Sequence, residues 1–133
     1  MFYLHEEAEY LVGTDTWLAS DSPSSSFSIV FEDDEETAYF YALNSDNKEQ
    51  PIVDALHIYN VSDVTDKDIP SKAQLCWHEN GLIGLLFIND YPHVIYDFEK
   101  KIGYSWKNFP EPAIGSEWKH ETLTNEFVEN LAK

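Results

Sequence analysis

The run LIGLLFI at residues 82–88 places the tightest limit on how this chain folds, because it is apolar at positions of both parities. A strand with one face in water alternates apolar and polar residues, whereas a strand covered on both faces is apolar throughout. Turn sequences flank the run, with Asn80-Gly81 before it and Asn89-Asp90-Tyr91-Pro92 after it. The pattern therefore predicts a central strand in a sheet that is covered on both sides.

The neighbouring segments alternate or are rich in aromatic and β-branched residues, which favours strands. They are residues 27–32, 37–43, 52–61, 73–78, 93–98 and 102–106, and residues 1–19 allow one or two edge strands in addition. Near the C-terminus the apolar residues follow one helical stripe, formed by Leu123, Phe127, Val128 and Leu131. We expect an α+β fold: a mainly antiparallel meander of six to eight strands with a C-terminal helix packed on it. The length predicts a single compact domain over residues 1–133.

The charge of the chain is strongly one-sided. It has 25 Asp and Glu residues against 8 Lys, no Arg, and a formal net charge of -17. A field of this sign repels nucleic acid and anionic membranes and attracts basic proteins. We expect no nucleic-acid or membrane partner, and a basic protein is the partner that the charge favours. Acidity that serves only solubility is an equally weighted alternative.

A single cysteine, Cys76, excludes an internal disulfide and fits a reducing compartment. The N-terminal segment MFYLHEEAEY carries acids where a signal peptide has basic and then apolar residues. No run approaches the ~18 apolar residues of a membrane span. These features predict a cytoplasmic protein and leave its oligomeric state open.

No motif for catalysis, metal binding or cofactor binding stands out. The five histidines are far apart in sequence and lack metal-ligand spacing; they are His5, His57, His78, His93 and His120. The chain has no GxSxG sequence and no glycine-rich phosphate loop. We therefore expect no catalytic residue, no metal and no cofactor, and we favour a binding role over an enzymatic one.

Two acidic segments are the candidates for contact with a basic partner. The first is the tip of a predicted hairpin, Asp33, Asp34, Glu35 and Glu36, and the second is a loop that contains Asp63, Asp66 and Asp68. Four adjacent carboxylates repel one another unless water screens them or an outside cation pairs with them. Exposed rings can anchor such an interface, and the candidates are Tyr39, Tyr41, Trp106 and Trp118.

A different hypothesis is a small-ligand or enzymatic domain with a polar aromatic pocket on the sheet. Its residues are His57, Tyr59, His93 and Tyr96. Histidine and tyrosine side chains can orient a ligand or transfer a proton. In an alternating strand His57 and Tyr59 share a face, whereas His93 and Tyr96 do not.

Three segments, FEDDEETAYFYAL (31–43), ALHIYNV (55–61) and INDYPHVIYDF (88–98), resemble a family of short acidic bacterial proteins of unknown function. The resemblance extends from about Phe27 to Trp106 and implies a compact bacterial domain, without an assigned activity. The small acidic format is also similar to that of bacterial immunity proteins, which neutralise toxins. The first functional hypothesis is therefore an acidic binding protein, an immunity or antitoxin type of inhibitor of a basic effector.

Overall fold

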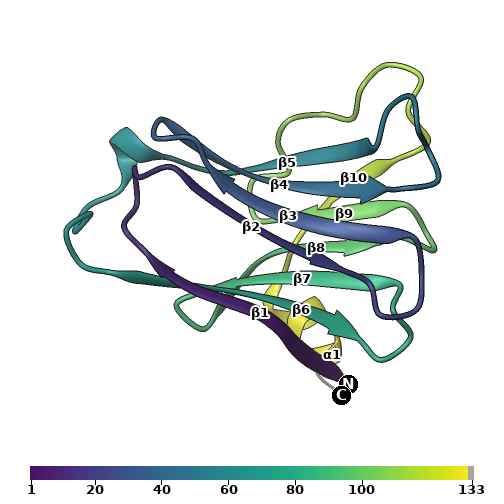
Figure 1. Cartoon of the computed structure of the whole chain (residues 1–133), viewed down its shortest axis with the longest axis horizontal. Helices are drawn as coiled ribbons and strands as arrows, with labels where there is room; N and C mark the ends of the chain where they lie inside the picture. The colour runs from purple at the N-terminus through teal and green to yellow at the C-terminus, as the bar shows by residue number, and fades with distance from the viewer. Residues whose placement is uncertain (132–133) are drawn as a thin grey trace.

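The computed structural model describes residues 1–131, which form ten strands, one 3-10 turn and one α-helix (Figure 1). The α+β class, with mainly antiparallel strands and a C-terminal helix, is confirmed. In chain order the elements are β1 (Phe2–Tyr10), β2 (Thr16–Asp21), β3 (Phe27–Asp33), β4 (Thr37–Asn44), β5 (Ile52–Asn60), η1 (Val61–Asp63), β6 (Ser71–His78), β7 (Ile83–Ile88), β8 (Tyr91–Asp97), β9 (Ile102–Ser105), β10 (Lys119–Thr122) and α1 (Asn125–Leu131).

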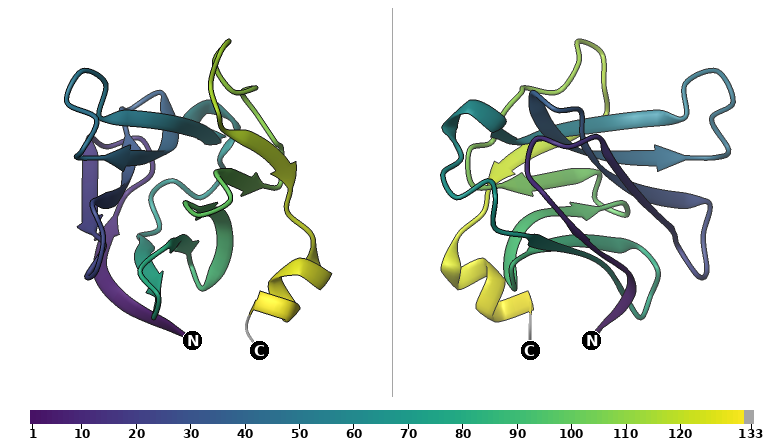
Figure 2. Two further views of the ribbon diagram at one scale, coloured as in Figure 1. Left: turned by 90° about the vertical axis from the view of Figure 1, so that its right-hand side faces the viewer. Right: turned by 60° about the vertical axis from the view of Figure 1, so that its left-hand side comes forward.

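The strands form two sheets that face each other (Figures 1 and 2). The six-stranded sheet has the order β1-β6-β7-β8-β9-β10, and the four-stranded sheet has the order β2-β3-β4-β5. Only β10 runs parallel to its neighbour, β9, within the described chain. A single meander of six to eight strands was the sequence expectation, and the structure has two sheets and more strands. Residues 1–21, where the sequence allows one or two edge strands, supply one strand to each sheet, and β10 was not predicted because its polar sequence KHET carries no strand pattern.

The core lies between the two sheets and consists of alternate side chains of their facing strands. Phe31, Phe40 and Leu56 from the four-stranded sheet are fully buried, as are Trp77 and Leu86 from the six-stranded sheet. These side chains belong to one apolar cluster, and burial of this kind is the main force that stabilises such a domain. A further link between the sheets is the Tyr96 hydroxyl, which donates to the Phe40 carbonyl oxygen at 2.7 Å.

The run LIGLLFI forms β7, which pairs with β6 and β8 inside the six-stranded sheet. Leu86 faces the core between the sheets, and Leu85 belongs to a second cluster on the other face. Helix α1 covers that outer face (Figure 2), where the Phe127 and Tyr104 rings lie 4.3 Å apart. The Thr124 hydroxyl accepts from the Phe127 backbone N–H at 3.1 Å and so caps the helix. The prediction of a strand covered on both sides is thus confirmed.

Candidate functional site

The outer face of the four-stranded sheet carries aromatic side chains. Alternation along β4 buries Phe40 and turns Tyr39 and Tyr41 outward, where their rings stack 6.0 Å apart. The Tyr41 hydroxyl donates to a Glu32 carboxylate oxygen at 2.9 Å, and burial together with that carboxylate raises the pKa of Tyr41. Glu32 of β3 pairs with Trp17 of the neighbouring strand β2, and the Trp17 side chain is 59% exposed.

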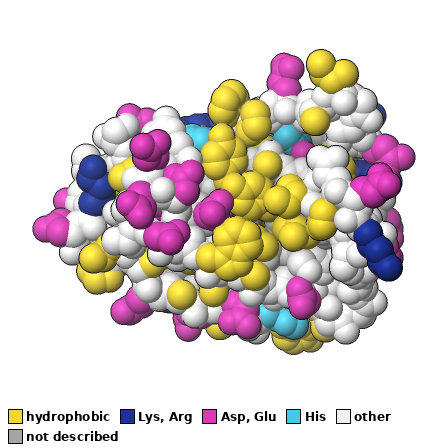
Figure 3. Space-filling view, turned by 45° about the horizontal axis from the view of Figure 1, so that its top comes forward, with side chains coloured by type: hydrophobic (Ala, Val, Ile, Leu, Met, Phe, Trp, Pro, Cys, Tyr) yellow, Lys and Arg dark blue, Asp and Glu magenta, His cyan; other side chains and the backbone are white. Residues whose placement is uncertain are grey.

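The loop between β9 and β10 extends this surface at the edge of the sheet. The His57 backbone N–H donates to the Phe109 carbonyl oxygen at 2.8 Å, so the loop pairs with the free edge of β5. The Phe109 ring is 54% exposed and contacts the His57 ring edge-on at 5.8 Å; the Tyr39 ring contacts it from another side at 5.4 Å. We call Trp17, Tyr39, Tyr41 and Phe109 the aromatic face. Figure 3 shows hydrophobic side chains across the middle of this view, with acidic side chains on both sides.

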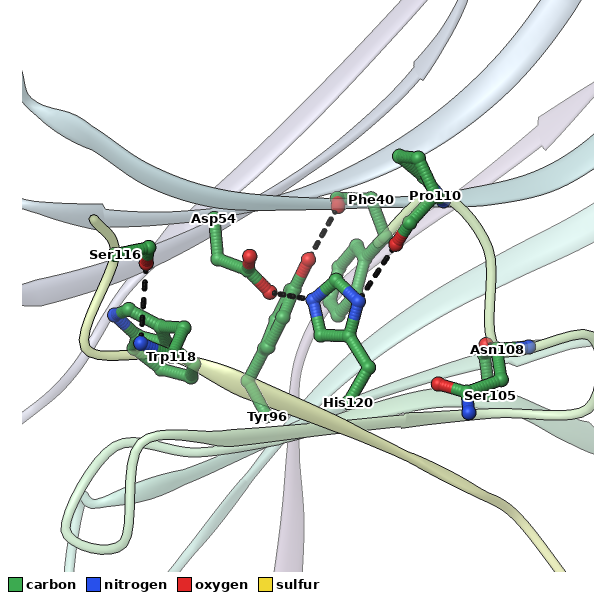
Figure 4. A network of polar contacts seen from close by, with 9 residues as sticks. All are labelled: Phe40, Asp54, Tyr96, Ser105, Asn108, Pro110, Ser116, Trp118 and His120. Carbon is green, nitrogen blue, oxygen red and sulfur yellow. Dashed lines mark hydrogen bonds and ion pairs between the residues drawn. The ribbon is translucent and has the colours of Figure 1, made fainter. Parts of the chain in front are cut away.

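A buried polar contact holds the loop in place. The His120 Nε2 atom lies 2.7 Å from an Asp54 carboxylate oxygen, and its Nδ1 atom lies 2.7 Å from the Pro110 carbonyl oxygen (Figure 4). Both side chains are almost completely buried. A carbonyl oxygen only accepts, so Nδ1 carries a hydrogen and fixes the ring orientation. Sequence reasoning missed this pair, because Asp54 and His120 are 66 positions apart and neither belongs to a motif.

The two acidic segments predicted as partner contacts meet at one end of the four-stranded sheet. The Val61 backbone N–H donates to the Glu36 carbonyl oxygen at 2.8 Å, which joins the β3–β4 turn to η1. The exposed acids at this end are Asp34, Glu35, Glu36, Asp63, Asp66 and Asp68, and we call them the acidic end. Backbone N–H groups of Thr37 and Glu36 donate to Asp34 and lower its pKa, so that this carboxylate also shapes the turn.

Asp33 does not belong to that exposed group, and its prediction as a partner contact is wrong. Its side chain is fully buried, because it has the same parity as the core residues Ile29 and Phe31. Backbone N–H groups of Gly13 and Glu35 donate to its two oxygens at 2.8 and 2.9 Å, and the Tyr59 hydroxyl donates at 2.7 Å. Asp33 therefore connects three separate segments of the chain.

The predicted polar pocket is half assembled by the structure. His57 and His93 line one cavity of about 210 Å³, together with Ile58, Ser105, Trp106 and Lys107. Tyr59 lies elsewhere, hydrogen bonded to Tyr10 and Asp33, and Tyr96 is fully buried in the core. Tyr59 and Tyr96 are thus no part of this cavity, since each points to the interior from its own strand.

Neither of the two tryptophans predicted as anchors is both exposed and without a hydrogen-bond partner. Trp118 is buried in the core, and the half-buried Trp106 donates its indole N–H to the Pro92 carbonyl oxygen at 2.8 Å. Cys76 is buried, and desolvation raises the pKa of its thiol to about 11, which makes it unreactive. Within residues 1–131 no three His, Cys, Asp or Glu side chains are grouped as metal ligands, and no helix is long and apolar enough to cross a membrane.

Comparison with known proteins agrees with the bacterial resemblance of the sequence. A family described as an uncharacterized protein conserved in bacteria, DUF2251, matches residues 10–132. An uncharacterized protein of Haemophilus influenzae is 41% identical over 130 residues, which cover 97% of this chain and 81% of that protein. No solved structure matches this chain. The match over nearly all of its length shows that the chain belongs to the DUF2251 family of bacterial proteins.

Proposed function

We propose that this protein binds a basic protein partner through the aromatic face and the acidic end of its four-stranded sheet. The observation that supports this most is a group of outward aromatic rings beside the Glu32 carboxylate in a chain of net charge -17. Protein interfaces have aromatic centres and polar rims, and tyrosine and tryptophan are the residues that most often dominate their affinity.

The two parts of the surface have different roles in the proposal. Tyr39, Tyr41 and Phe109 supply apolar area that leaves water on binding, and they lose little conformational entropy because they already contact one another or His57. The acidic end supplies a field that speeds the encounter with a cationic partner. An inhibitor of a basic bacterial effector, such as an immunity protein, needs both apolar contact area and fast association. We place this activity in the cytoplasm, where a single free thiol is stable.

A photo-crosslinking amino acid tests the proposal in the bacterium that encodes the protein. It is placed at Tyr39, and in a matched control at Glu126, an exposed residue of α1 on the other side of the molecule. We expect one basic protein to be crosslinked from position 39 and not from position 126. The purified pair should then form a complex that the double variant Tyr39→Ser/Tyr41→Ser weakens at least ~10-fold. Equal products from both positions would contradict the proposal.

A further inference from the structure

Glu32 lies between aromatic side chains on the outer face of the four-stranded sheet. In the register of the strands it pairs with Trp17 of β2 on one side and with Tyr39 of β4 on the other. Side chains that are directly opposite in an antiparallel sheet project from the same face, with their Cβ atoms about 5 Å apart. The Glu32 carboxylate therefore has an aromatic side chain on each side of it.

The Tyr41 hydroxyl fixes one oxygen of that carboxylate and leaves the other accessible. It donates to Oε1 of Glu32 at 2.9 Å, and the Tyr41 ring is stacked with the Tyr39 ring. Oε2 of Glu32 has no hydrogen-bond partner and no ion pair among residues 1–131. It is not one of the unpaired atoms that are buried there, so it reaches solvent.

The charges around Glu32 favour a cation as the group that meets this oxygen. Every lysine of the chain lies outside strands β2, β3, β4 and β5. Burial and the Glu32 carboxylate raise the pKa of Tyr41, and the Asp34 carboxylate contributes in the same direction, so its field reaches the same place. A half-buried carboxylate among rings, with a second acid close by, attracts a positive group.

We propose that Glu32, Trp17 and Tyr39 bind an arginine side chain of the basic partner. This inference rests on the proposed function and names the partner group that the aromatic face receives. A guanidinium group can pair with a carboxylate through its N–H groups while its flat face lies against an aromatic ring. The ammonium group of lysine pairs with a carboxylate as a point charge and has no flat face to stack.

The test is a titration of the full chain with acetyl-Gly-Arg-Gly-amide, followed by NMR of the tryptophan indole N–H groups. Trp17 is 59% exposed, whereas Trp77 and Trp118 are buried and Trp106 donates its N–H to Pro92. We expect a saturable shift of the Trp17 signal, which the variant Trp17→Phe identifies, and none of the other three. Acetyl-Gly-Lys-Gly-amide should bind a few-fold more weakly, and acetyl-Gly-Gln-Gly-amide should give no shift.

Two variants separate the Glu32 carboxylate from the general charge of the face. Glu32→Gln keeps an oxygen for the Tyr41 hydroxyl and removes the charge, and it should weaken binding of the arginine peptide about 5- to 10-fold. Asp21→Asn removes the same charge from an exposed residue of β2, on the face of Trp17 and about 13 Å along the strand. It should weaken binding less than about two-fold. Unchanged signals of the buried indoles show that each variant is folded.

The outcomes distinguish this inference from the proposed function. No saturable shift at Trp17, equal binding of the lysine peptide, or equal weakening by the two variants overturns the arginine site. None of these readouts requires the basic partner, so a crosslinking experiment without a product overturns the proposed function and leaves the titration unchanged. A partner complex whose affinity is the same in Glu32→Gln keeps the proposed function and overturns the arginine site.

Discussion

The two sheets of this protein differ in what covers their outer faces. The six-stranded sheet is closed by α1, which places Phe127 against Tyr104 and forms a second apolar cluster there. The four-stranded sheet carries no helix within the described residues, and its outer face shows Trp17, Tyr39 and Tyr41 with acids beside them. The chain thus covers the outer face of one sheet with its own helix and leaves the outer face of the other without one.

The largest effect that we expect comes from breaking the covered sheet. Leu86→Asp places a carboxylate without a partner between the sheets, at a cost of several kcal/mol against a total stability of about 5–15 kcal/mol. We expect the variant to be unfolded at room temperature by circular dichroism. Tyr39→Asp is the matched change on the outer face of the four-stranded sheet, which we call the open face. This variant should melt within a few degrees of the parent. If both variants are equally stable, the difference between the two faces is wrong.

A pair of variants at Asp33 and Glu35 tests whether a buried acid stabilises the four-stranded sheet more than an exposed acid does. Asp33→Ala leaves the Gly13 and Glu35 N–H groups and the Tyr59 hydroxyl without their acceptor. We expect a loss of roughly 3 kcal/mol in the free energy of unfolding, measured with urea. The exposed neighbour substituted in Glu35→Ala should change that free energy by less than about 0.5 kcal/mol. A similar small effect at both positions would mean that the Asp33 contacts are not stabilising.

A third pair of variants compares a ring under α1 with a ring on the open face. Phe127 is half-buried against Tyr104, whereas Phe109 is 54% exposed. Phe127→Ala should cost about 1–2 kcal/mol of folding stability, less than the 3–5 kcal/mol of a fully buried ring. Phe109→Ala should cost clearly less in folding, and in the proposed function it should weaken partner binding. Denaturation curves of the two variants decide between a covered and an open face.

The sequence predicted the elements whose pattern is local. β7 is apolar at both parities because both of its faces are covered, and the hairpin of β3 and β4 alternates because one face is open. The stripe that ends in Leu131 gave α1 for the same reason. β10 was not predicted because its sequence KHET has no apolar alternation; in the structure it pairs with β9 in parallel.

Contacts between distant residues could not be predicted from these patterns. Asp33 looked like part of a solvated acidic tip, and only the parity of β3 within the folded sheet places it inside. His57 and His93 share a cavity because β5 packs near β8 and β9 across two sheets, a fact that no single strand encodes. The pair of Asp54 and His120 depends on the loop that returns to the edge of β5.

The last prediction removes charge from the acidic end. It has the smallest expected effect on folding and tests most directly whether the acidic end takes part in association. Glu35 and Glu36 are exposed at the acidic end, and no ion pair within the described chain involves their carboxylates. Glu35→Gln/Glu36→Gln should leave the free energy of unfolding within about 0.5 kcal/mol of the parent. Against the proposed basic partner it should slow association a few-fold at low salt and flatten the dependence of the association rate on salt.

Glu126→Gln/Glu129→Gln on α1 is the control for that last change. It removes the same charge from exposed residues of the covered side, so it alters the net charge equally and the local field at the open face much less. Stopped-flow association rates across a salt series compare the two variants. Equal slowing would mean that only net charge matters and that the acidic end serves solubility. Slowing confined to Glu35→Gln/Glu36→Gln would locate the encounter at the acidic end, next to the aromatic face that the chain leaves uncovered.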